Sequence, residues 1–174
     1  MLANPIRELP RGDRYLYQEK ADGERAVITI SEDKVEAVNR RDNNITKNFL
    51  NELTQIKINC ESVVLDAELC AESFDKLQQR ALTQNQAKLR FLSKLIPVTI
   101  YVFDVLNING VDMTKKELQD RLNLLKKIVQ ENEAVKILRT YEHTELYKLL
   151  DEVKQKKRKK KEKIKRRKWV FTLH

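Results

Sequence analysis

The sequence predicts an α+β fold in a single domain with a hydrophobic core, and two patterns along the chain carry that prediction. Alternating or continuous apolar runs typical of strands occur at residues 15–31, 34–40, 62–70 and 97–106. Apolar residues at helical spacing occur at residues 46–56, 73–96, 118–129 and 144–153. A chain of 174 residues is long enough to bury one such core.

The composition excludes a membrane-spanning protein and a secreted protein stapled by disulfides. Hydrophobic residues make up 41% of the chain, and no apolar run approaches the length of a membrane span. The first residues show no signal-peptide pattern. The two cysteines, Cys60 and Cys70, have neither the spacing of metal ligands nor that of a disulfide framework. We therefore expect an intracellular protein, in the cytoplasm, nucleoid or nucleus, that does not associate with membranes.

The basic charge of the chain is concentrated in one segment. The formal net charge is +9. Residues 154–168 contain twelve Lys and Arg against Glu162 alone, so this segment carries +11 and the rest of the chain −2. The body of the protein is nearly neutral, and overall basicity is therefore a weak argument for nucleic-acid binding.

The most distinctive segment lies within the first apolar run. Lys20 is followed by Asp22, Gly23 and Arg25, with apolar alternation before and after. This pattern predicts a strand, a tight turn and a return strand, in which Gly23 lets the backbone turn sharply or approach a ligand closely. We expect Lys20 at the end of the first strand and Arg25 at the start of the second.

Nucleophilic attack by a lysine on a phosphate is the chemistry that suits this layout. A lysine with an ordinary pKa of about 10.4 is a poor nucleophile at neutral pH, and burial or nearby cations lower that pKa. Arg25 would supply the positive field and bind phosphate, while Asp22 would hold the geometry. The alternative is a plain hairpin whose turn exposes a lysine.

Two further places carry charged side chains at predicted strands. Arg40 ends the run at 34–40 and is either a phosphate ligand or a solvated loop residue. Asp66 and Glu68 lie two residues apart in a strand and therefore point to the same face. Paired carboxylates are costly unless a suitable group lies opposite, and Mg²⁺ or a ribose hydroxyl would serve. The alternative is a strand end with solvated acids.

The remaining elements are expected to serve packing. Thr114 and Glu117 have the spacing of a capping box and predict the start of the next helix. A short strand is expected at 135–138, and Phe103, in a strongly apolar strand, is either a ligand contact or part of the core. The apolar faces of four helices are expected to contain Phe49, Leu50, Leu53 and Ile56; Phe74, Leu77 and Ala81; Leu89, Leu92 and Ile96; and Leu146, Leu149, Leu150 and Val153.

Four ordered motifs resemble those of a known family. Residues 20–25 read K-A-D-G-E-R and match K-x-D-G-x-R, the nucleotidyl-transfer motif of ATP-dependent DNA ligases, RNA ligases and mRNA capping enzymes. Residues 66–68 resemble the ligase motif D-G-E, with Ala67 in place of the glycine. Residues 74–80 resemble F-x-x-L-Q-x-R, and residues 97–110 resemble P-V-x-x-x-x-F-D-x-L-x-x-x-G.

The resemblance implies a partial DNA ligase adenylation domain at residues 1–153, followed by a basic tail at residues 154–174. The segment at 74–80 and the helix at 118–125 favour a DNA ligase, and an RNA ligase or a capping-type nucleotidyltransferase stays as the alternative. The fold so implied is the nucleotidyltransferase fold, with mixed antiparallel sheets and outer helices, incomplete at the C-terminus.

The resemblance also implies a mechanism with ATP and Mg²⁺ as cofactors. Lys20 would attack ATP to form lysyl-AMP, and the AMP would pass to the 5′-phosphate at a nick in double-stranded DNA during repair or recombination. Phe103 would stack on adenine, and Glu68 would bind the ribose or the metal. Gln18 replaces the usual glutamate of the adenine contact, which makes Glu19 an alternative. The nucleotide contacts so implied are Gln18, Glu19, Asp22, Arg25, Arg40, Glu68 and Phe103. We expect a monomer.

The family pattern continues with motifs that this sequence does not contain. The family has an E-G-x-x-x-K strand and a K-x-K strand next, whereas the last glycine here is Gly110 and no E-G pair occurs. We therefore expect weak adenylylation and little nick sealing. The basic tail is a nucleic-acid-binding arm, a solvated helix extension or the product of a shifted reading frame, which we favour. A function of another class, a non-catalytic nucleic-acid-binding protein that keeps the fold, also stays open.

Overall fold

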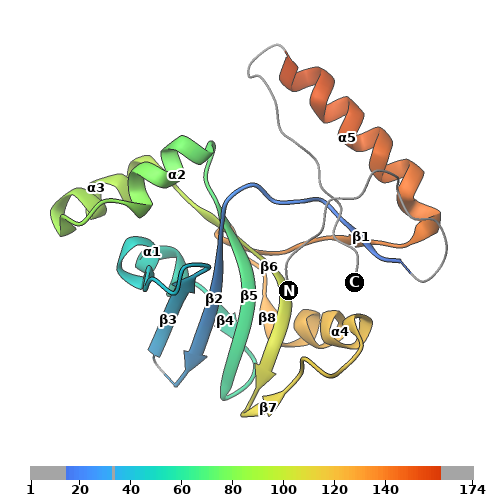
Figure 1. Ribbon diagram of the computed structural model, residues 1–174, viewed down its shortest axis with the longest axis horizontal. Helices are drawn as coiled ribbons and strands as arrows, with labels where there is room; N and C mark the ends of the chain where they lie inside the picture. The colour runs from blue at the N-terminus through green and yellow to red at the C-terminus, as the bar shows by residue number, and fades with distance from the viewer. Residues whose placement is uncertain (1–14, 33, 162–174) are drawn as a thin grey trace. The chain divides into compact units, whose positions relative to one another are not determined.

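The computed structural model describes residues 15–32 and 34–161, and the chain divides into two compact units (Figure 1). The sheet unit consists of residues 21–137, and the terminal unit combines residues 1–20 with residues 138–174. Residues 1–14 and the end of the basic tail lie outside the described residues.

The sheet unit is built on six strands in the order β3-β2-β5-β6-β7, with β9 beside β6. These strands are β2 (Glu24–Ser31), β3 (Lys34–Asn39), β5 (Ser62–Cys70), β6 (Thr99–Ile108), β7 (Val111–Asp112) and β9 (Val135–Ile137). All neighbours pair antiparallel except β6 and β9, which are parallel. The strands predicted at 34–40, 62–70, 97–106 and 135–138 are thereby confirmed.

Strand alternation gives this sheet a buried face and a polar face. In β2, Ala26, Ile28 and Ile30 are buried, whereas Val27 and Thr29 are exposed. The buried face continues through the aligned apolar residues of β5 and β6, all of which are buried except Ile108, which is half-buried. The polar face is therefore the place where charged side chains of the three strands meet.

Four helices belong to the sheet unit: α1 (Thr46–Leu53), α2 (Phe74–Ala81), α3 (Gln86–Leu95) and α4 (Leu118–Ile128). The side chain of Ser73 caps α2 and that of Asn85 caps α3, each by accepting a backbone N–H of the first turn. The prediction of two helices within 73–96 is confirmed. A small two-stranded sheet, β4 (Lys57–Ile58) with β8 (Val129–Gln130), connects the end of α4 to the segment after α1.

Three details of the predicted helices are wrong. Leu50 is exposed because the backbone of α1 is kinked at Phe49, which shifts the helical phase. Phe74 is exposed because it begins α2, whose buried residues are Leu77 and Arg80. The capping box at Thr114 does not form: its backbone N–H and hydroxyl both donate to Asp112, and α4 begins four residues later without a side-chain cap.

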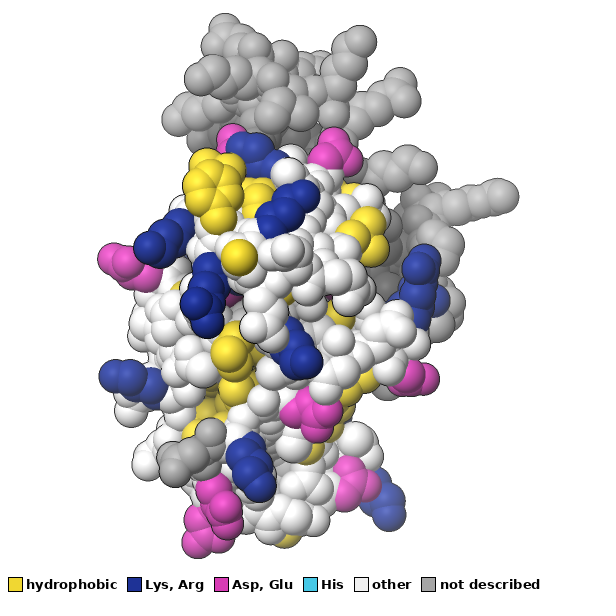
Figure 2. Space-filling model, turned by 90° about the vertical axis from the view of Figure 1, so that its left-hand side faces the viewer, with side chains coloured by type: hydrophobic (Ala, Val, Ile, Leu, Met, Phe, Trp, Pro, Cys, Tyr) yellow, Lys and Arg dark blue, Asp and Glu magenta, His cyan; other side chains and the backbone are white. Residues whose placement is uncertain are grey.

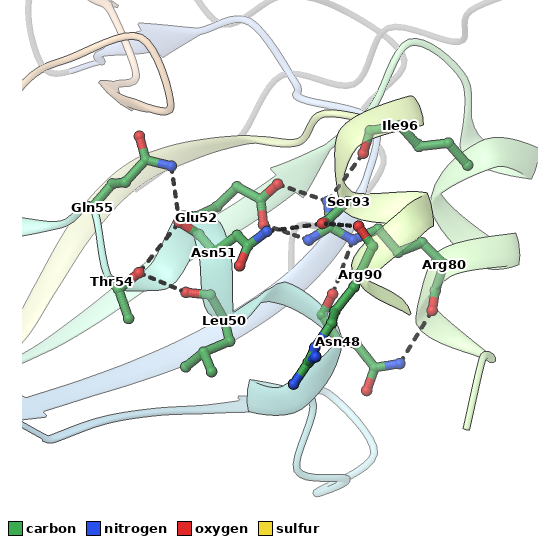
Figure 3. A network of polar contacts seen from close by, with 10 residues as sticks. All are labelled: Asn48, Leu50, Asn51, Glu52, Thr54, Gln55, Arg80, Arg90, Ser93 and Ile96. Carbon is green, nitrogen blue, oxygen red and sulfur yellow. Dashed lines mark hydrogen bonds and ion pairs between the residues drawn. The ribbon is translucent and has the colours of Figure 1, made fainter. Parts of the chain in front are cut away.

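A buried polar network ties α1, α2 and the end of α3 together (Figure 3). The Arg80 guanidinium forms a bidentate ion pair with Glu52 and donates to the carbonyl groups of Asn48 and Ile96. The Asn48 amide donates in return to three carbonyl groups that follow one another closely at the end of α2, those of Arg80, Ala81 and Thr83. Every charge in this network is compensated, as burial requires.

The terminal unit has a sheet and a core of its own. β1 (Tyr17–Gln18) pairs antiparallel with β10 (Thr140–Tyr141), followed by η1 (His143–Glu145) and α5 (Leu146–Lys161). Its buried core consists of Tyr17, Tyr141, Leu146, Leu149 and Val153, with Leu150 partly buried against it. The inward face predicted for the helix at 144–153 is thus confirmed, and α5 continues past residue 153.

The predicted hairpin at 15–31 is wrong. β1 pairs with β10 and β2 pairs with β3 and β5, so the segment 19–23 connects strands of two different sheets. Local alternation identifies a strand but not its partner, and here the partner of β1 lies more than a hundred residues later. Among the described helices, none combines the length and apolar character needed to cross a bilayer.

Candidate active site

Gly23 attaches the K-x-D-G segment to the end of β5. Its backbone N–H donates a hydrogen bond to Glu68 Oε1 at 3.1 Å. A Cβ atom at this position would lie 2.0 Å from the carbonyl oxygen of Leu69, closer than any contact allows. The glycine is therefore required by close backbone approach, and it brings two motifs that lie far apart in the sequence to one place.

Arg25 and Asp66 form the central ion pair of the polar face. Arg25 Nε donates to Asp66 Oδ1 at 2.8 Å, and Nη2 donates to Oδ2. Hydrogen bonding to Asp66 raises the pKa of Arg25, burial partly opposes this, and the negative charges of Glu68 and Asp104 add to the rise. The cation that compensates the buried Asp66 is thus Arg25, while the expected contact of Glu68 with Mg²⁺ or a ribose stays a prediction.

Phe103 lies at an irregularity of the sheet beside this pair. Asp66 is aligned with Asp104 and Ala67 with Val102, so Phe103 is an extra residue without a partner on β5. Such bulges redirect side chains and are common beside active sites. The ring is half-buried, and the Arg25 guanidinium carbon lies 5.6 Å from its centroid. Phe103 is therefore not a sealed core residue, and one of its contacts is the site arginine.

A second arginine–carboxylate pair lies next to the first and was missed from the sequence. Arg121 of α4 donates from Nε and Nη2 to the two carboxylate oxygens of Asp104, both at 2.8 Å. Hydrogen bonding to Asp104 raises the pKa of Arg121, against the opposing effect of burial. Since Asp66 and Asp104 are cross-strand neighbours, two like charges would repel without an arginine on each. The sequence feature that could have indicated this pair is Asp104, a charged residue directly after Phe103 in a strongly apolar strand.

The register also places Lys136 on the polar face. Arg25 is aligned with Glu68, Glu68 with Tyr101, and Tyr101 with Lys136, so four strands contribute one row. Aligned residues point to the same side of a sheet, and the Lys136 side chain is exposed. With strands about 4.8 Å apart, its Cα lies roughly 10 Å from that of Glu68. In the sequence, the feature that could have indicated this position is Lys136 itself, a charged residue inside a short apolar strand.

The remaining predicted residues lie in two places. Arg40 is exposed directly after β3, whose last residue, Asn39, is aligned with Ala26 and donates to Glu24 Oε1 at 2.8 Å. Arg40 therefore lies at the end of the sheet where β2 begins, near Arg25 in the chain direction of β2. Asp22 is exposed on the segment that leads into β2.

Three predicted residues belong to the terminal unit. Gln18 is buried in β1 and donates from Nε2 to Thr140 Oγ1 at 2.9 Å. Glu19 is half-buried, and Lys20, the last residue of this part of the unit, is exposed. Lys20 precedes Gly23 by three residues, so the chain itself limits the distance between their Cα atoms to about 11 Å.

The carboxylates of the polar face fit a magnesium ion that binds one protein carboxylate and takes its other ligands from phosphates and water. The described residues contain no group of three or more His, Cys, Asp or Glu side chains placed to bind a metal. Asp66 and Asp104 are engaged by arginines, and Glu68 accepts the Gly23 N–H. Mg²⁺ commonly binds through one or two carboxylates together with phosphates and water, and Glu68 can be such a ligand.

Comparisons with known proteins agree with the motifs. The family model described as ATP dependent DNA ligase domain matches residues 1–164. A DNA ligase of Sulfolobus acidocaldarius is 35% identical over 133 residues, which cover 72% of this chain and 22% of the relative. A DNA ligase of Hyperthermus butylicus is 30% identical over 144 residues, which cover 78% of this chain and 24% of the relative. The chain thus spans about a quarter of the length of these curated relatives.

Solved structures show the same fold. The ligase domain of M. tuberculosis LigD matches with a TM-score of 0.57 and 18% identity, over 82% of this chain and 46% of that one. A mycobacterial DNA ligase D complexed with ATP and MES matches with a TM-score of 0.54 and 14% identity, over the same shares of the two chains. These likenesses confirm the predicted fold class. The family model that matches residues 1–164, together with the relative that is 35% identical, shows that the chain belongs to the family of ATP-dependent DNA ligase domains.

Proposed function

We propose that this chain carries the lysine that accepts AMP in an ATP-dependent DNA ligase. The observation that carries the proposal is the hydrogen bond from Gly23 to Glu68, supported by the close packing of Gly23 on Leu69. It joins the lysine motif to the acidic motif on β5, and Arg25, Asp66 and Phe103 surround the junction. A plain hairpin turn with an exposed lysine would not need a glycine packed on another strand.

In the proposed first step, the unprotonated Lys20 amine attacks the α-phosphate of ATP. The bond between the α-phosphorus and the bridging oxygen breaks, pyrophosphate leaves, and a phosphorus–nitrogen bond holds AMP on the lysine. Arg25, fixed by Asp66, is positioned to neutralise phosphate charge, and Arg40 at the same end of the sheet adds a second cation. Phe103 would stack on adenine, with Gln18 or Glu19 as a further base contact and Asp22 holding the loop.

Magnesium would be held by Glu68 and the ATP phosphates, where it would offset negative charge as pyrophosphate leaves. Asp66 and Asp104 are each engaged by an arginine, and Glu68 accepts the backbone N–H of Gly23 beside the lysine motif. The same residue would otherwise bind the ribose.

The later steps act on DNA. AMP passes from Lys20 to the 5′-phosphate at a nick in double-stranded DNA, and the 3′-hydroxyl then attacks that phosphate and releases AMP. We propose that the chain works as a monomer inside the cell, where ATP and DNA are available, in repair or recombination. We also propose that residues 1–153 form the adenylation domain and that residues 154–174 form a separate basic tail.

The direct test is self-adenylylation with ATP labelled at the α-phosphate in the presence of Mg²⁺. We expect label on the intact chain and none on Lys20→Ala, whereas Lys34→Ala, an exposed lysine at the far end of β2 and β3, should keep it. Label that survives Lys20→Ala would overturn the proposal. Preference for labelled GTP over ATP would instead support the capping-type alternative.

A further inference from the structure

The segment between Asp75 and Asp104 contains no acidic residue. These 28 residues, 76–103, carry five Lys and Arg in a chain that has 26 Asp and Glu overall. Two of the five cations are compensated within the fold, since Lys76 pairs with Glu72 and Arg80 with Glu52. The other three all lie on α3.

Helix α3 presents these cations on its outward side. Leu89 and Leu92 are its buried residues, and Ser93 accepts a hydrogen bond from Asn51 of α1, so this side packs against the unit. At 100° per residue, Phe91 and Lys94 lie opposite this side, Arg90 and Leu95 lie on either side of them, and Lys88 lies at the edge next to Leu92; all five are exposed. None of the three cations forms an ion pair with a described residue.

Two large apolar side chains stand among the cations. Phe91 is 65% exposed and Leu95 is 63% exposed, one helical turn apart. Figure 2 shows the side of the molecule on which α3 and α1 lie in Figure 1, with Lys and Arg side chains spread over it, hydrophobic side chains between them, and Asp and Glu side chains on the same side. Because the described residues leave these side chains exposed, the outward face of α3 combines positive charge with an exposed aromatic ring.

We propose that the outward face of α3 is a contact surface for the sugar–phosphate backbone of duplex DNA, a proposal that rests on the proposed function. Three cations within ten residues, with no acid near them in sequence, suit successive phosphates. Phe91 suits the apolar surface of a deoxyribose between them. The charge complementarity favours a regular polyanion over a protein partner, because α3 carries +3 whereas the rest of residues 21–137, with 14 Lys and Arg against 18 Asp and Glu, carries −4.

The test compares two charge-matched triple variants of the full chain, so that the basic tail is the same in both. The first is Lys88→Ala/Arg90→Ala/Lys94→Ala. The control is Lys115→Ala/Lys126→Ala/Lys127→Ala, whose residues are also exposed and lie before and within α4. Binding to a fluorescent nicked duplex is measured by anisotropy from low to moderate salt, and self-adenylylation is measured on the same samples.

We expect the α3 variant to lose on the order of tenfold or more in affinity at low salt, and its log–log salt slope to fall by about 2 to 3, at roughly 0.9 per phosphate contact. The control should lose much less. Phe91→Ala should weaken binding without changing the slope. Equal losses in both triple variants, or an unchanged slope in the α3 variant, would overturn the proposal.

These measurements distinguish a failure of the proposed DNA contact at α3 from a failure of the proposed function. Self-adenylylation should be unchanged in the α3 variant, because α3 contains none of the proposed nucleotide contacts. A wild-type chain without self-adenylylation would refute the proposed function, while a selective α3 effect on DNA binding would still support the surface. Selective loss of binding to an acidic protein, with DNA binding unaffected, would assign the face to a protein partner and refute this proposal.

Discussion

Two arginine–carboxylate pairs of the sheet unit have the same bidentate chemistry in different surroundings. In the helical layer, the side chains of Arg80 and Glu52 are 1% and 7% exposed, and four of the five N–H donors of Arg80 meet Glu52 or a backbone carbonyl. On the polar face of the sheet, Asp66 is 5% exposed but Arg25 is 28% exposed and lies over Phe103. The first pair is enclosed on all sides, whereas the second holds its carboxylate in the protein and presents its arginine outward.

The difference shows what each pair can contribute. A sealed pair fixes how elements pack, and its removal leaves an uncompensated buried charge. A pair with one exposed partner fixes the orientation of a group that can still meet a ligand. We therefore expect substitutions in the first pair to act on stability and substitutions around the second to act on adenylylation.

The largest effect is expected in the sealed pair. Arg80→Met leaves Glu52 buried without a cation and should lower the free energy of unfolding by about 3–5 kcal/mol. Urea denaturation followed by circular dichroism measures it. The double variant Arg80→Met/Glu52→Leu, which removes both charges, should recover a large part of the loss, and a double variant as unstable as the single one would contradict this view.

The next effect is expected at Gly23. Gly23→Ala places a Cβ where the Leu69 carbonyl lies, so the K-x-D-G segment must shift. Self-adenylylation should fall on the order of a hundredfold, as expected for a reacting group displaced by about 1 Å. Gly110→Ala is the matched control, because Gly110 has a φ of +81° but open space around it.

The control separates backbone strain from displacement of the site. Gly110→Ala should cost about 1 kcal/mol of stability through its left-handed conformation and leave self-adenylylation unchanged. A similar loss of adenylylation in both variants would mean that the activity follows stability and not the position of Gly23.

A smaller effect is expected at Asp66. Asp66→Asn should reduce self-adenylylation about tenfold, because a neutral amide cannot hold both guanidinium donors of Arg25. A double-mutant cycle with Arg25→Lys, measured on self-adenylylation, tests whether the two residues act together. Strictly additive losses would show that Asp66 does not position Arg25.

The smallest effect is expected at Lys136. Lys136→Ala should raise the ATP concentration for half-maximal adenylylation only a few-fold and change stability by less than about 0.5 kcal/mol, as for other exposed positions. Lys57→Ala, exposed on β4 outside the row, is the comparison. Equal behaviour of the two variants would remove Lys136 from the site.

Much of the sheet unit could be predicted from the sequence, because its strands alternate apolar and polar residues and its helices show apolar faces. The site motifs were identified from short patterns, and the structure brings Gly23, Arg25, Glu68 and Phe103 together. The roles assigned to Lys20 and the other contacts stay predictions. What the sequence did not show are partnerships over long distances: Arg25 with Asp66, Asp104 with Arg121, and β1 with β10.

The local errors have local physical reasons. The capping box at Thr114 does not form, because the backbone N–H and hydroxyl of Thr114 both donate to Asp112 and the helix begins only at Leu118. Leu50 leaves the apolar stripe because the helix is kinked at Phe49, and periodicity assumes a regular helix. Lys136 could not be assigned to the site from local sequence, which indicates only a surface residue. Its place beside the site follows from the strand register, which aligns it with Tyr101.

The pairing of β1 with β10 has a consequence for the order in which the molecule is completed during synthesis. The sheet unit is one continuous stretch, so all its strands have their partners once residue 137 has left the ribosome. Tyr17 must wait for Tyr141, which is made much later. The nascent chain thus carries Lys20 from the beginning, but the segment before it gains its fixed neighbour only when β10 has been made, and we expect the proposed nucleophile to be held from both sides only after residue 141 has left the ribosome.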